Sequence, residues 1–289
     1  MKEINLVSPA QVKKLLQERG LGVHKKWGQN FLVDRNTVDK ILREVGAQAG
    51  EHILEIGPGL GVITLPMAQG GANLLAVEID RGLTDLLEEL LEDFPQAKLW
   101  NADIRKINLR DLIEETWKKQ VEVKLVANLP YYITSPLLYR LLEGEVAWTK
   151  AVLMMQKEVA QRLVAPAGSP DYGALSVLAH CFTQTQYRFT VSRNVFFPAP
   201  QVESAVVTSI PVEAKYGIPD LRLFKQVVFA AFAQRRKTLL NSLHRGLGFE
   251  KSRLQEWLEQ GGISSKRRGE ELTPQEFAKL SILIYNVVK

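Results

Sequence analysis

The sequence predicts an α/β protein, with a doubly wound and mostly parallel sheet followed by a small all-helical domain. Between residues 52 and 163, short apolar stretches alternate with amphipathic stretches of helical length, and strands separated by helices imply parallel crossovers. After about Pro211 only helical periodicity remains, interrupted by glycines. We therefore expect one domain over residues 1–211 and a helical domain over residues 212–289.

The expected elements of the first domain follow one another regularly. Ser8 and Pro9 open a helix that Gly20 ends, since the hydroxyl can cap the helix and proline fits its first turn. Either Asp34 or Asn36 can cap the next helix. Strands are then expected at His52–Ile56, Asn73–Ile79, Lys98–Asn101, Val121–Asn128 and Ala151–Gln156, and helices at Val62–Gln69, Arg81–Phe94, Leu109–Lys118 and Ser135–Glu143.

The later elements are of two kinds. Gln186–Val191 and Glu203–Ile210 are expected to be strands that can pair antiparallel at the sheet edge. Helices are expected at Lys157–Leu163, Ala174–His180, Phe224–Gln234, Lys237–Leu247, Lys251–Glu259 and Pro274–Val288, with breaks at Gly246, Gly248, Gly261 and Gly262.

The composition is that of a globular protein with a sizeable core. Hydrophobic residues make up 46% of the chain, and no apolar stretch approaches the ~18 residues of a membrane span. Cys181 is the only cysteine, and the four histidines lack ligand spacing, so we expect neither a disulfide nor a metal site. The sequence therefore predicts a soluble, cytoplasmic protein with no membrane contact.

The positive charge is concentrated in the second domain. The chain carries +5 overall, whereas residues 215–289 hold 14 lysines and arginines against 7 acidic residues. Arg235, Arg236 and Lys237 stand at a predicted helix start, and Lys266, Arg267 and Arg268 lie in a loop. Either triplet alone would be a solvated face. Two of them in the basic domain favour contacts with nucleic-acid phosphates, to which Lys25 and Lys26 could add.

A glycine-rich turn follows the first predicted strand of the sheet. Glu55-Ile56-Gly57-Pro58-Gly59-Leu60-Gly61 has the spacing G-x-G-x-G, which permits close approach of the backbone to a ligand. It is not the dinucleotide spacing G-x-G-x-x-G, and Pro58 removes an amide that could hold a pyrophosphate. The turn alone leaves open a connection without a ligand or an NAD site.

Polar side chains also follow the next three strands. Glu78 ends the second strand, where a carboxylate can accept from ribose hydroxyls, and Asp103 follows the third, where it can accept from an adenine amino group. Asn128 ends the fourth. Because the carboxyl ends of parallel strands share one edge, this series predicts a Rossmann-like site for S-adenosylmethionine, whose sulfonium needs no pyrophosphate cradle.

Asn128-Leu129-Pro130-Tyr131 places an amide, a rigid turn and an aromatic ring at a strand end. An adenine amino nitrogen is a poor nucleophile, because its lone pair is delocalised into the ring. The Asn128 side-chain oxygen and the Leu129 carbonyl can accept its hydrogens, while Tyr131 stacks on a base taken out of its helix. In isolation this motif would be an ordinary turn. No general base is required, since the amine loses its proton easily after attack.

A second aromatic wall is expected from the proline-stiffened stretch Val195–Ser204. Either Phe196 or Phe197 could face the pocket or the core, and we favour Phe196 for the pocket.

Four motifs together resemble the ribosomal RNA adenine dimethyltransferases, over nearly the whole chain. They are Gly28-Gln29-Asn30-Phe31-Leu32, the glycine turn with Glu55, Asn128-Leu129-Pro130-Tyr131 and Phe196-Phe197-Pro198-Ala199-Pro200-Gln201-Val202. Leu129, where the relatives that methylate large-subunit RNA usually have isoleucine, and the stretch 232–243 are similar to the bacterial small-subunit members.

The resemblance implies transfer of two methyls to each of two adjacent adenosines in a hairpin near the 3′ end of 16S rRNA, in an immature small subunit. S-adenosylmethionine is the implied donor and S-adenosylhomocysteine the product. Cofactor contacts are implied at Asn30, Leu32, Gly57, Glu78, Asp103 and Asn128. The N-terminal loop becomes a lid over the cofactor, the first twenty residues gain no role, and nothing requires more than a monomer.

Two other functions remain open from the sequence. One is a non-catalytic RNA-binding factor that checks immature small subunits, a role that can coexist with methylation. The other is a DNA adenine methyltransferase, although such enzymes usually have proline where Leu129 stands and carry an added target-recognition domain.

Overall fold

The computed structural model describes residues 5–24, 27–130, 133–213, 216–234 and 236–288. It divides into two compact units, the first formed by Met1–Ala160 with Gln186–Ile210 and the second by Gln161–Thr185 with Pro211–Lys289. The predicted boundary near residue 211 is one edge of the second unit. That unit also takes in Gln161–Thr185, where Tyr172 is fully buried and donates a hydrogen bond from its hydroxyl to the Leu272 carbonyl at 2.9 Å.

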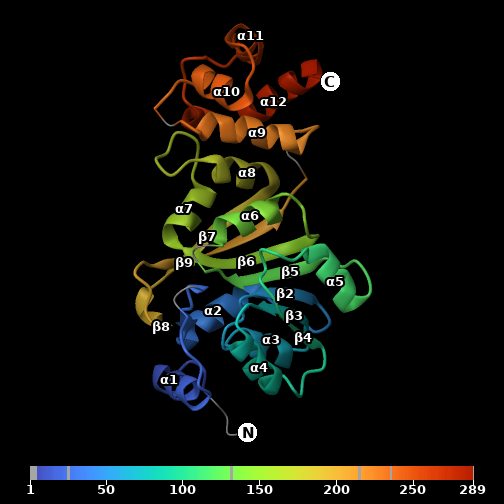
Figure 1. Cartoon of the computed structure of the whole chain (residues 1–289), viewed down its shortest axis with the longest axis vertical. Helices are drawn as coiled ribbons and strands as arrows, with labels where there is room; N and C mark the ends of the chain where they lie inside the picture. Colours follow the sequence, from blue (N-terminus) through green and yellow to red (C-terminus); the bar gives the residue numbers. More distant parts are fainter. Residues whose placement is uncertain (1–4, 25–26, 131–132, 214–215, 235, 289) are drawn as a thin grey trace. The chain divides into compact units, whose positions relative to one another are not determined.

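The described residues form a seven-stranded sheet, in which the strands that come first in the sequence are parallel (Figure 1). The strands β2, β3, β4, β5 and β6 pair in parallel, in the spatial order β4-β3-β2-β5-β6. Next to β6 lie β9, which is antiparallel to it as predicted, and then β7. The bounds are β2 His52–Ile56, β3 Asn73–Glu78, β4 Ala97–Asn101, β5 Val123–Asn128, β6 Trp148–Gln156, β7 Thr183–Val191 and β9 Ser204–Pro211.

The order of the strands reverses between β2 and β5, which is where doubly wound sheets bind ligands. Both faces of the sheet are covered, since successive residues such as Ile53 and Leu54 are both fully buried and point to opposite faces. The predicted α/β class is therefore confirmed, and the sequence-predicted site residues that follow β2 and β5 come to this reversal point.

Asp34, Asp80 and Asn108 cap helices of the first unit, whereas the Ser8 hydroxyl, predicted to cap the first helix, accepts no capping hydrogen bond. Asp34, rather than Asn36, accepts from the Thr37 amide at 2.8 Å, and Asp80 accepts from the Gly82 amide at 3.0 Å. The helices are α1 Pro9–Glu18, α2 Arg35–Val45, α3 Thr64–Gln69, α4 Arg81–Leu90, α5 Leu109–Trp117, α6 Thr134–Leu142 and α7 Lys157–Val164, the last of which continues into the second unit.

The N-terminal helix α1 docks on α4. Leu15 and Leu16 are buried in one cluster with Leu83 and Leu86 of α4. Beside them, the Arg19 guanidinium makes two hydrogen bonds to the Glu89 carboxylate, at 2.7 and 2.6 Å.

A second, two-stranded sheet was not predicted from the sequence. The strand β1 (Phe31–Leu32) pairs antiparallel with β8 (Phe196–Phe197), and the Val33 amide extends the ladder by donating to the Val195 carbonyl at 2.9 Å. The short helix η2 (Arg193–Val195) precedes β8. This pairing joins the N-terminal segment to the proline-rich stretch that follows β7.

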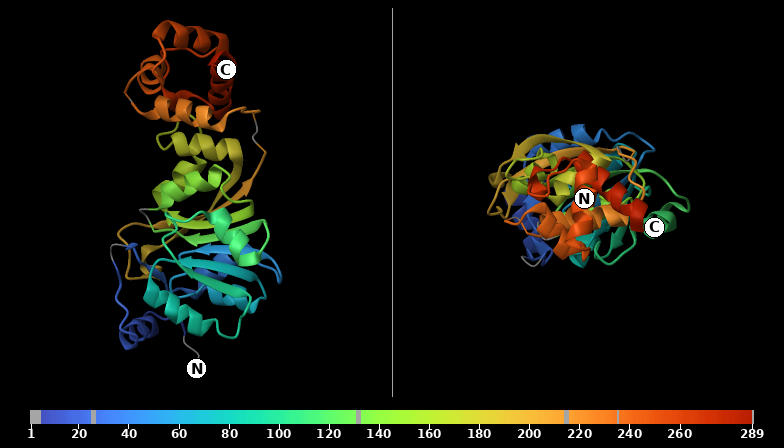
Figure 2. Two further views of the ribbon diagram at one scale, coloured as in Figure 1. Left: turned by 45° about the vertical axis from the view of Figure 1, so that its right-hand side comes forward. Right: turned by 90° about the horizontal axis from the view of Figure 1, so that it is seen from above.

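The C-terminal part of the second unit is helical, as predicted, and Figure 2 shows these helices gathered into one bundle. Its elements are α8 Ala174–Phe182, α9 Leu221–Phe232, α10 Leu239–Leu247, α11 Lys251–Gly261, the short η3 Gly269–Glu271 and α12 Pro274–Val288. No helix among the described residues is long and apolar enough to cross a membrane.

Two details of this bundle differ from expectation. Arg236 and Lys237 precede α10 instead of opening it, because Thr238 has extended backbone angles and is the residue before the helix. Gly246 was predicted to interrupt the helix, but it lies inside α10, and Gly261 is likewise the last residue of α11. A Cβ at Gly246 would lie 2.4 Å from the Ala230 Cβ, so the glycine allows α9 and α10 to pack closely.

Candidate active site

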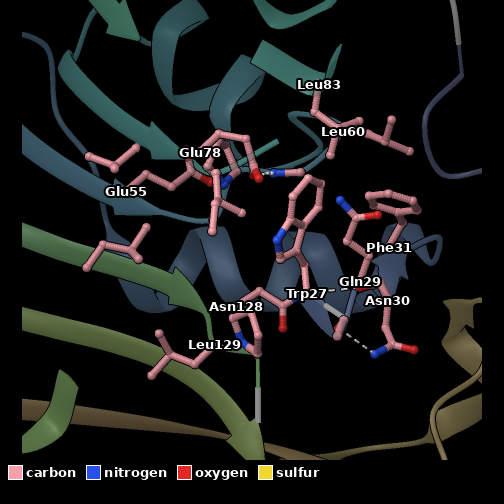
Figure 3. Close-up of a pocket in the computed structure, with 18 of the residues that line it drawn as sticks. Trp27, Gln29, Asn30, Phe31, Glu55, Leu60, Glu78, Leu83, Asn128 and Leu129 are labelled. Atoms are coloured by element: carbon pink, nitrogen blue, oxygen red, sulfur yellow. Dashed lines mark hydrogen bonds between the residues drawn. The ribbon is translucent and has the colours of Figure 1, made fainter. Parts of the chain in front are cut away.

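A pocket lies within the first unit, at the carboxyl ends of the parallel strands (Figure 3). Glu78 and Asn128 stand on the strand ends, and Trp27, Gln29 and Asn30 lie across from them. The lining residues are Trp27, Gly28, Gln29, Asn30, Phe31, Leu32, Glu55, Ile56, Gly57, Pro58, Gly59, Leu60, Val62, Ile63, Val77, Glu78, Ile79, Leu83, Ala102, Asp103, Ile104, Asn128, Leu129, Pro130, Ile133, Phe196 and Ser204.

The glycine turn has its amides already engaged. Gly57 donates to the Val77 carbonyl at 2.9 Å, Gly59 donates to Glu78 Oε2 at 3.2 Å, and Gly61 donates to the Pro58 carbonyl at 3.0 Å. Pro58 has no N–H. A pyrophosphate is held by free backbone amides at a helix start, and these four residues supply none, so the turn suits a ligand without a pyrophosphate.

Glu78 is nearly fully buried at the end of β3. One carboxylate oxygen accepts from the Asp80 amide at 3.0 Å and the other accepts from the Gly59 amide at 3.2 Å. Burial raises the pKa of this carboxyl, although the two amides oppose the shift. Each oxygen keeps further capacity to accept a hydrogen bond, as a ligand hydroxyl would require.

Glu55 is a site residue whose role the sequence did not predict. It is 3% exposed, lines the pocket and has an Oε2 atom without a hydrogen-bond partner. Burial raises the pKa of its carboxyl to about 8, so it is mostly protonated at neutral pH. The available signal was a single acidic residue in the otherwise apolar strand Ile53-Leu54-Glu55-Ile56.

Asp103 also lines the pocket, but it is not free. Its carboxylate binds the Arg105 guanidinium through two hydrogen bonds, of 2.9 and 2.6 Å. These contacts keep the pKa of Asp103 below its ordinary value, so the group is a stable anion and acceptor at neutral pH. A carboxylate can accept about four hydrogen bonds, so an amino group can still bind beside Arg105.

Asn128 is tied to the N-terminal segment. Its Nδ2 atom donates to the Asn30 backbone carbonyl at 3.4 Å. Leu129 is buried, and its amide donates to the Met154 carbonyl at 2.8 Å, while the Pro130 carbonyl accepts from the Ile133 amide at 3.1 Å. Tyr131, predicted to stack on a base, lies outside the described residues.

The two phenylalanines of β8 point to different places. Phe196 lines the pocket and is 5% exposed, whereas Phe197 packs against the cluster that α1 and α4 form. Successive residues of a strand face opposite sides, so only one of the pair can serve as a pocket wall.

The segment Gly28–Leu32 forms one side of the pocket and contains two predicted cofactor contacts, Asn30 and Leu32. Trp27 and Gln29 line the same side, and sequence reasoning assigned no contact to either, because a polar loop has no periodicity to interpret. The Gln29 side-chain amide donates to Asp80 Oδ2 at 2.7 Å.

The basic triplets are brought together in the second unit. The Leu239 amide donates to the Arg267 carbonyl at 2.6 Å and the Leu240 amide to the Ser265 carbonyl at 3.3 Å, so the loop lies against the start of α10. The exposed cations here are Arg236, Lys237, Lys266 and Arg268; Arg235, Lys25 and Lys26 lie outside the described residues.

Arg267 differs from its neighbours because its guanidinium is turned into the unit. It is half-buried, contacts Glu276 at 2.5 Å and donates to the Glu271 carbonyl. The hydrogen bond to Glu276 raises its pKa. The sequence grouped Arg267 with the phosphate contacts, but the structure places it as an internal support of the loop.

Comparison with known protein families gives a match over most of the chain. The model of the family described as "Ribosomal RNA adenine dimethylase" matches residues 20–286. The chain is similar to ribosomal RNA small subunit methyltransferase A of Clostridioides difficile strain 630, with 41% identity over 281 residues, 96% of each chain. The protein of the same name from Shouchella clausii is 38% identical over 288 residues, 99% of this chain and 97% of that one.

Two solved structures share the fold. A dimethyladenosine transferase from Plasmodium falciparum superposes with a TM-score of 0.72, at 24% identity, over 89% of this chain and 97% of that chain. The 23S rRNA methyltransferase ErmE superposes with a TM-score of 0.65, also at 24% identity, over 89% of this chain and all of that chain.

Proposed function

This chain belongs to the ribosomal RNA adenine dimethylase family, and from that premise we propose that it methylates the 6-amino groups of two adjacent adenosines in the 3′-terminal hairpin of 16S rRNA. Each adenosine receives two methyls. S-adenosylmethionine is the donor, S-adenosylhomocysteine is the product, and the substrate is an immature small ribosomal subunit in the cytoplasm. The enzyme acts as a monomer without a metal.

The residues of the pocket fit S-adenosylmethionine, which supplies an activated methyl group when it is bound. Glu78 would accept from ribose hydroxyls, and Asp103 would accept from the adenine amino group; both line the pocket. Gly57 would allow close backbone approach, and Asn30, Leu32 and Asn128, which line the same pocket, would complete the contacts. The engaged amides of Gly57, Gly59 and Gly61 support this ligand over a dinucleotide, because they are not free to hold a pyrophosphate.

The target adenine is activated by acceptors rather than by a base. The Asn128 side-chain oxygen and the Leu129 carbonyl would accept the two hydrogens of its amino group, which would leave the nitrogen lone pair available and align it with the methyl group that S-adenosylmethionine would supply. Pro130 fixes the turn, Phe196 would form one wall for the flipped base, and Tyr131 is the residue that we expect to stack on it. After attack, the amine proton leaves to solvent.

The second unit binds the RNA backbone. Arg236, Lys237, Lys266 and Arg268 are exposed beside one another, and Arg235 extends the same triplet. Their contacts to phosphates position the RNA without reading its sequence, and recognition of the target rests on loop shape and on the flipped base. Arg267 supports the loop that carries its neighbours.

One observation carries the proposal. Asn128, the glycine turn, Glu78 and Asp103 come from four different strand ends and line a single pocket. An acceptor pair for an amino group therefore adjoins a set of groups that suits S-adenosylmethionine.

The test is to incubate the protein with labelled S-adenosylmethionine and undermethylated 30S particles, and to map the product by primer extension. Blocks at two adjacent adenosines of the 3′-terminal hairpin are expected. Label in large-subunit RNA alone would contradict the small-subunit assignment, and label in duplex DNA would favour a DNA methyltransferase.

A further inference from the structure

Gln29 connects the cofactor side of the pocket to the rest of the N-terminal segment. Its Nε2 atom donates to Asp80 Oδ2 at 2.7 Å, and its Oε1 atom accepts from the His24 amide at 2.7 Å. Asp80 is 6% exposed and immobilised, since its other oxygen caps α4. Its own amide donates to Glu78. Gln29 is therefore held by Asp80, next to Glu78, the proposed acceptor for ribose hydroxyls.

The next residue along the chain contacts the target side. The Asn30 backbone carbonyl accepts from Asn128 Nδ2, and the Asn30 side chain donates back to the Gly28 carbonyl within the same segment. The Asn30 side chain therefore stiffens the segment but does not attach it to another element. That attachment is made by the Gln29 side chain on one side and by the β1–β8 pairing on the other.

The contact to Asn128 selects one orientation of its amide. A side-chain amide has a donor end and an acceptor end, which a half-turn exchanges. A carbonyl can only accept, so Asn30 holds the donor end of Asn128 and leaves Oδ1 free to accept. Methyl transfer as proposed above requires an acceptor at that atom, and the reverse orientation would present a donor to the target amine.

We propose that Gln29 is a positioning residue for methyl transfer: through Asp80, it holds the Asn30 carbonyl where that carbonyl orients the Asn128 amide. The inference rests on the proposed function and deepens it. Asn128 remains the group that touches the target, and Gln29 acts through it.

The first test compares Gln29→Met, which keeps the length of the side chain and removes the amide, with the wild type. We expect kcat for 30S particles to fall about 10- to 100-fold, because a displacement near 1 Å is sufficient for such a loss. The Kd for S-adenosylhomocysteine is measured beside kcat, because Asn30 and Leu32 of the same segment are proposed cofactor contacts, and it should change less than kcat. Gln120→Met is the matched control, since Gln120 makes a similar contact of 2.6 Å to Glu114 on the surface.

A second variant adds a signature that a purely structural role would not produce. Gln29→Glu sets a carboxylate against Asp80, and the two repel at pH 7. As the pH falls towards 5, one of them takes up a proton and can donate, so kcat relative to the wild type should rise. His24, whose Nε2 lies 3.9 Å from Asp80, and Glu78 face the same group, so full pH profiles of both proteins are compared.

The outcomes distinguish the positioning role of Gln29 from the proposed function. Wild-type kcat in Gln29→Met, or a weaker Kd with unchanged kcat, overturns the positioning role while the proposed function stands. Absence of methyl transfer by the wild type overturns the proposed function itself. Thermal unfolding is measured for each variant, and if Gln29→Met fails to fold, the pH response of Gln29→Glu decides.

Discussion

A buried carboxyl with an unpartnered oxygen, as in Glu55, gives the clearest prediction for a single residue. Its pKa is about 8 in the folded protein, because of burial, against an ordinary value of 4.5. Between these values the folded state holds one more proton than the unfolded state. As the pH rises from 4.5 to about 8, this group should therefore lower the free energy of unfolding by about 1.4 kcal/mol per pH unit. Above about pH 8 its contribution should no longer change.

We expect Glu55→Gln to remove that slope, so the variant gains on the wild type as the pH rises from 5 to 8. Urea unfolding at several pH values measures the difference. Burial also raises the pKa of Glu78, a residue that is present in both proteins. Parallel stability curves for the two proteins would contradict the prediction.

Asn128 is the second residue for which a substitution is decisive. Asn128→Ala removes an acceptor for the target amine and leaves Glu78 and Asp103 in place. We expect methyl transfer to fall by at least about 100-fold, as for other preorganised polar groups, while the cofactor still binds, with a far smaller loss, through Glu78 and Asp103. Asn73→Ala is a suitable control, since Asn73 donates to the Gly50 carbonyl at 2.8 Å from the opposite end of a strand. Wild-type turnover by Asn128→Ala would remove the amide from the mechanism.

Much of the pocket could be predicted at this scale, for a physical reason. Gly57, Glu78, Asp103 and Asn128 each follow a strand, and parallel strands end at one edge. Gln29 could not be predicted to contact Asp80, because that contact joins residues 51 positions apart and depends on how a loop folds back. The internal pairing of Arg267 with Glu276 leaves no trace in a run of three basic residues.

At the scale of elements, the close packing of α9 and α10 at Gly246 gives a prediction for stability. Alanine is the better helix former by about 1 kcal/mol, so propensity alone predicts that Gly246→Ala stabilises α10. The close approach to Ala230 predicts the opposite, a loss of about 1–3 kcal/mol from overpacking. Ala230→Gly in the same chain should recover part of that loss, and chemical denaturation of the three proteins measures it. A stabilised Gly246→Ala protein would be inconsistent with the close contact.

Two neighbouring arginines of the basic loop that precedes η3 should have different roles, Arg268 in RNA binding and Arg267 in stability. Arg268→Ala should leave stability unchanged and lower the salt dependence of RNA affinity, by about 0.7–0.9 in the slope of log K against log salt for each phosphate that Arg268 neutralises. Arg267→Ala should instead destabilise the second unit by about 1–3 kcal/mol, because Glu276 is left without this partner. Fluorescence anisotropy at several salt concentrations and thermal unfolding distinguish the two. Equal effects of both variants on both measurements would refute the division.

Most long elements follow from periodicity, whereas short ones do not. The strands β2 to β6 and the helices α9 to α12 lie within a few residues of their predicted bounds. The two-residue strands β1 and β8 are too short to show alternation, so only their pairing identifies them. Gly246 was predicted as a break because a glycine inside a helix is distinguished from one after it only by its neighbours in space.

For the whole molecule, the shift to helical periodicity predicted a second domain with an edge near residue 211. The second unit also includes Gln161–Thr185, which the order of elements along the chain assigns to the first domain. The reason is tertiary: Tyr172 packs edge-on against the Phe232 ring and donates to Leu272, and both partners lie far along the sequence. Local pattern contains no information about such distant partners.

The β1–β8 pairing has a consequence for processivity. Each dimethyladenosine needs two donors in succession, so the spent cofactor must be exchanged while the adenine is half modified. Opening the segment that carries Asn30 and Leu32 strains the strand that carries Phe196, since the backbones are hydrogen-bonded. We expect each cofactor exchange to weaken the contact between Phe196 and the base. Monomethylated adenosine should therefore be released and bound again. In a time course with excess 30S particles, monomethyladenosine should rise first and then decline; dimethyladenosine as the sole product from the first turnover would indicate that the two strands separate independently.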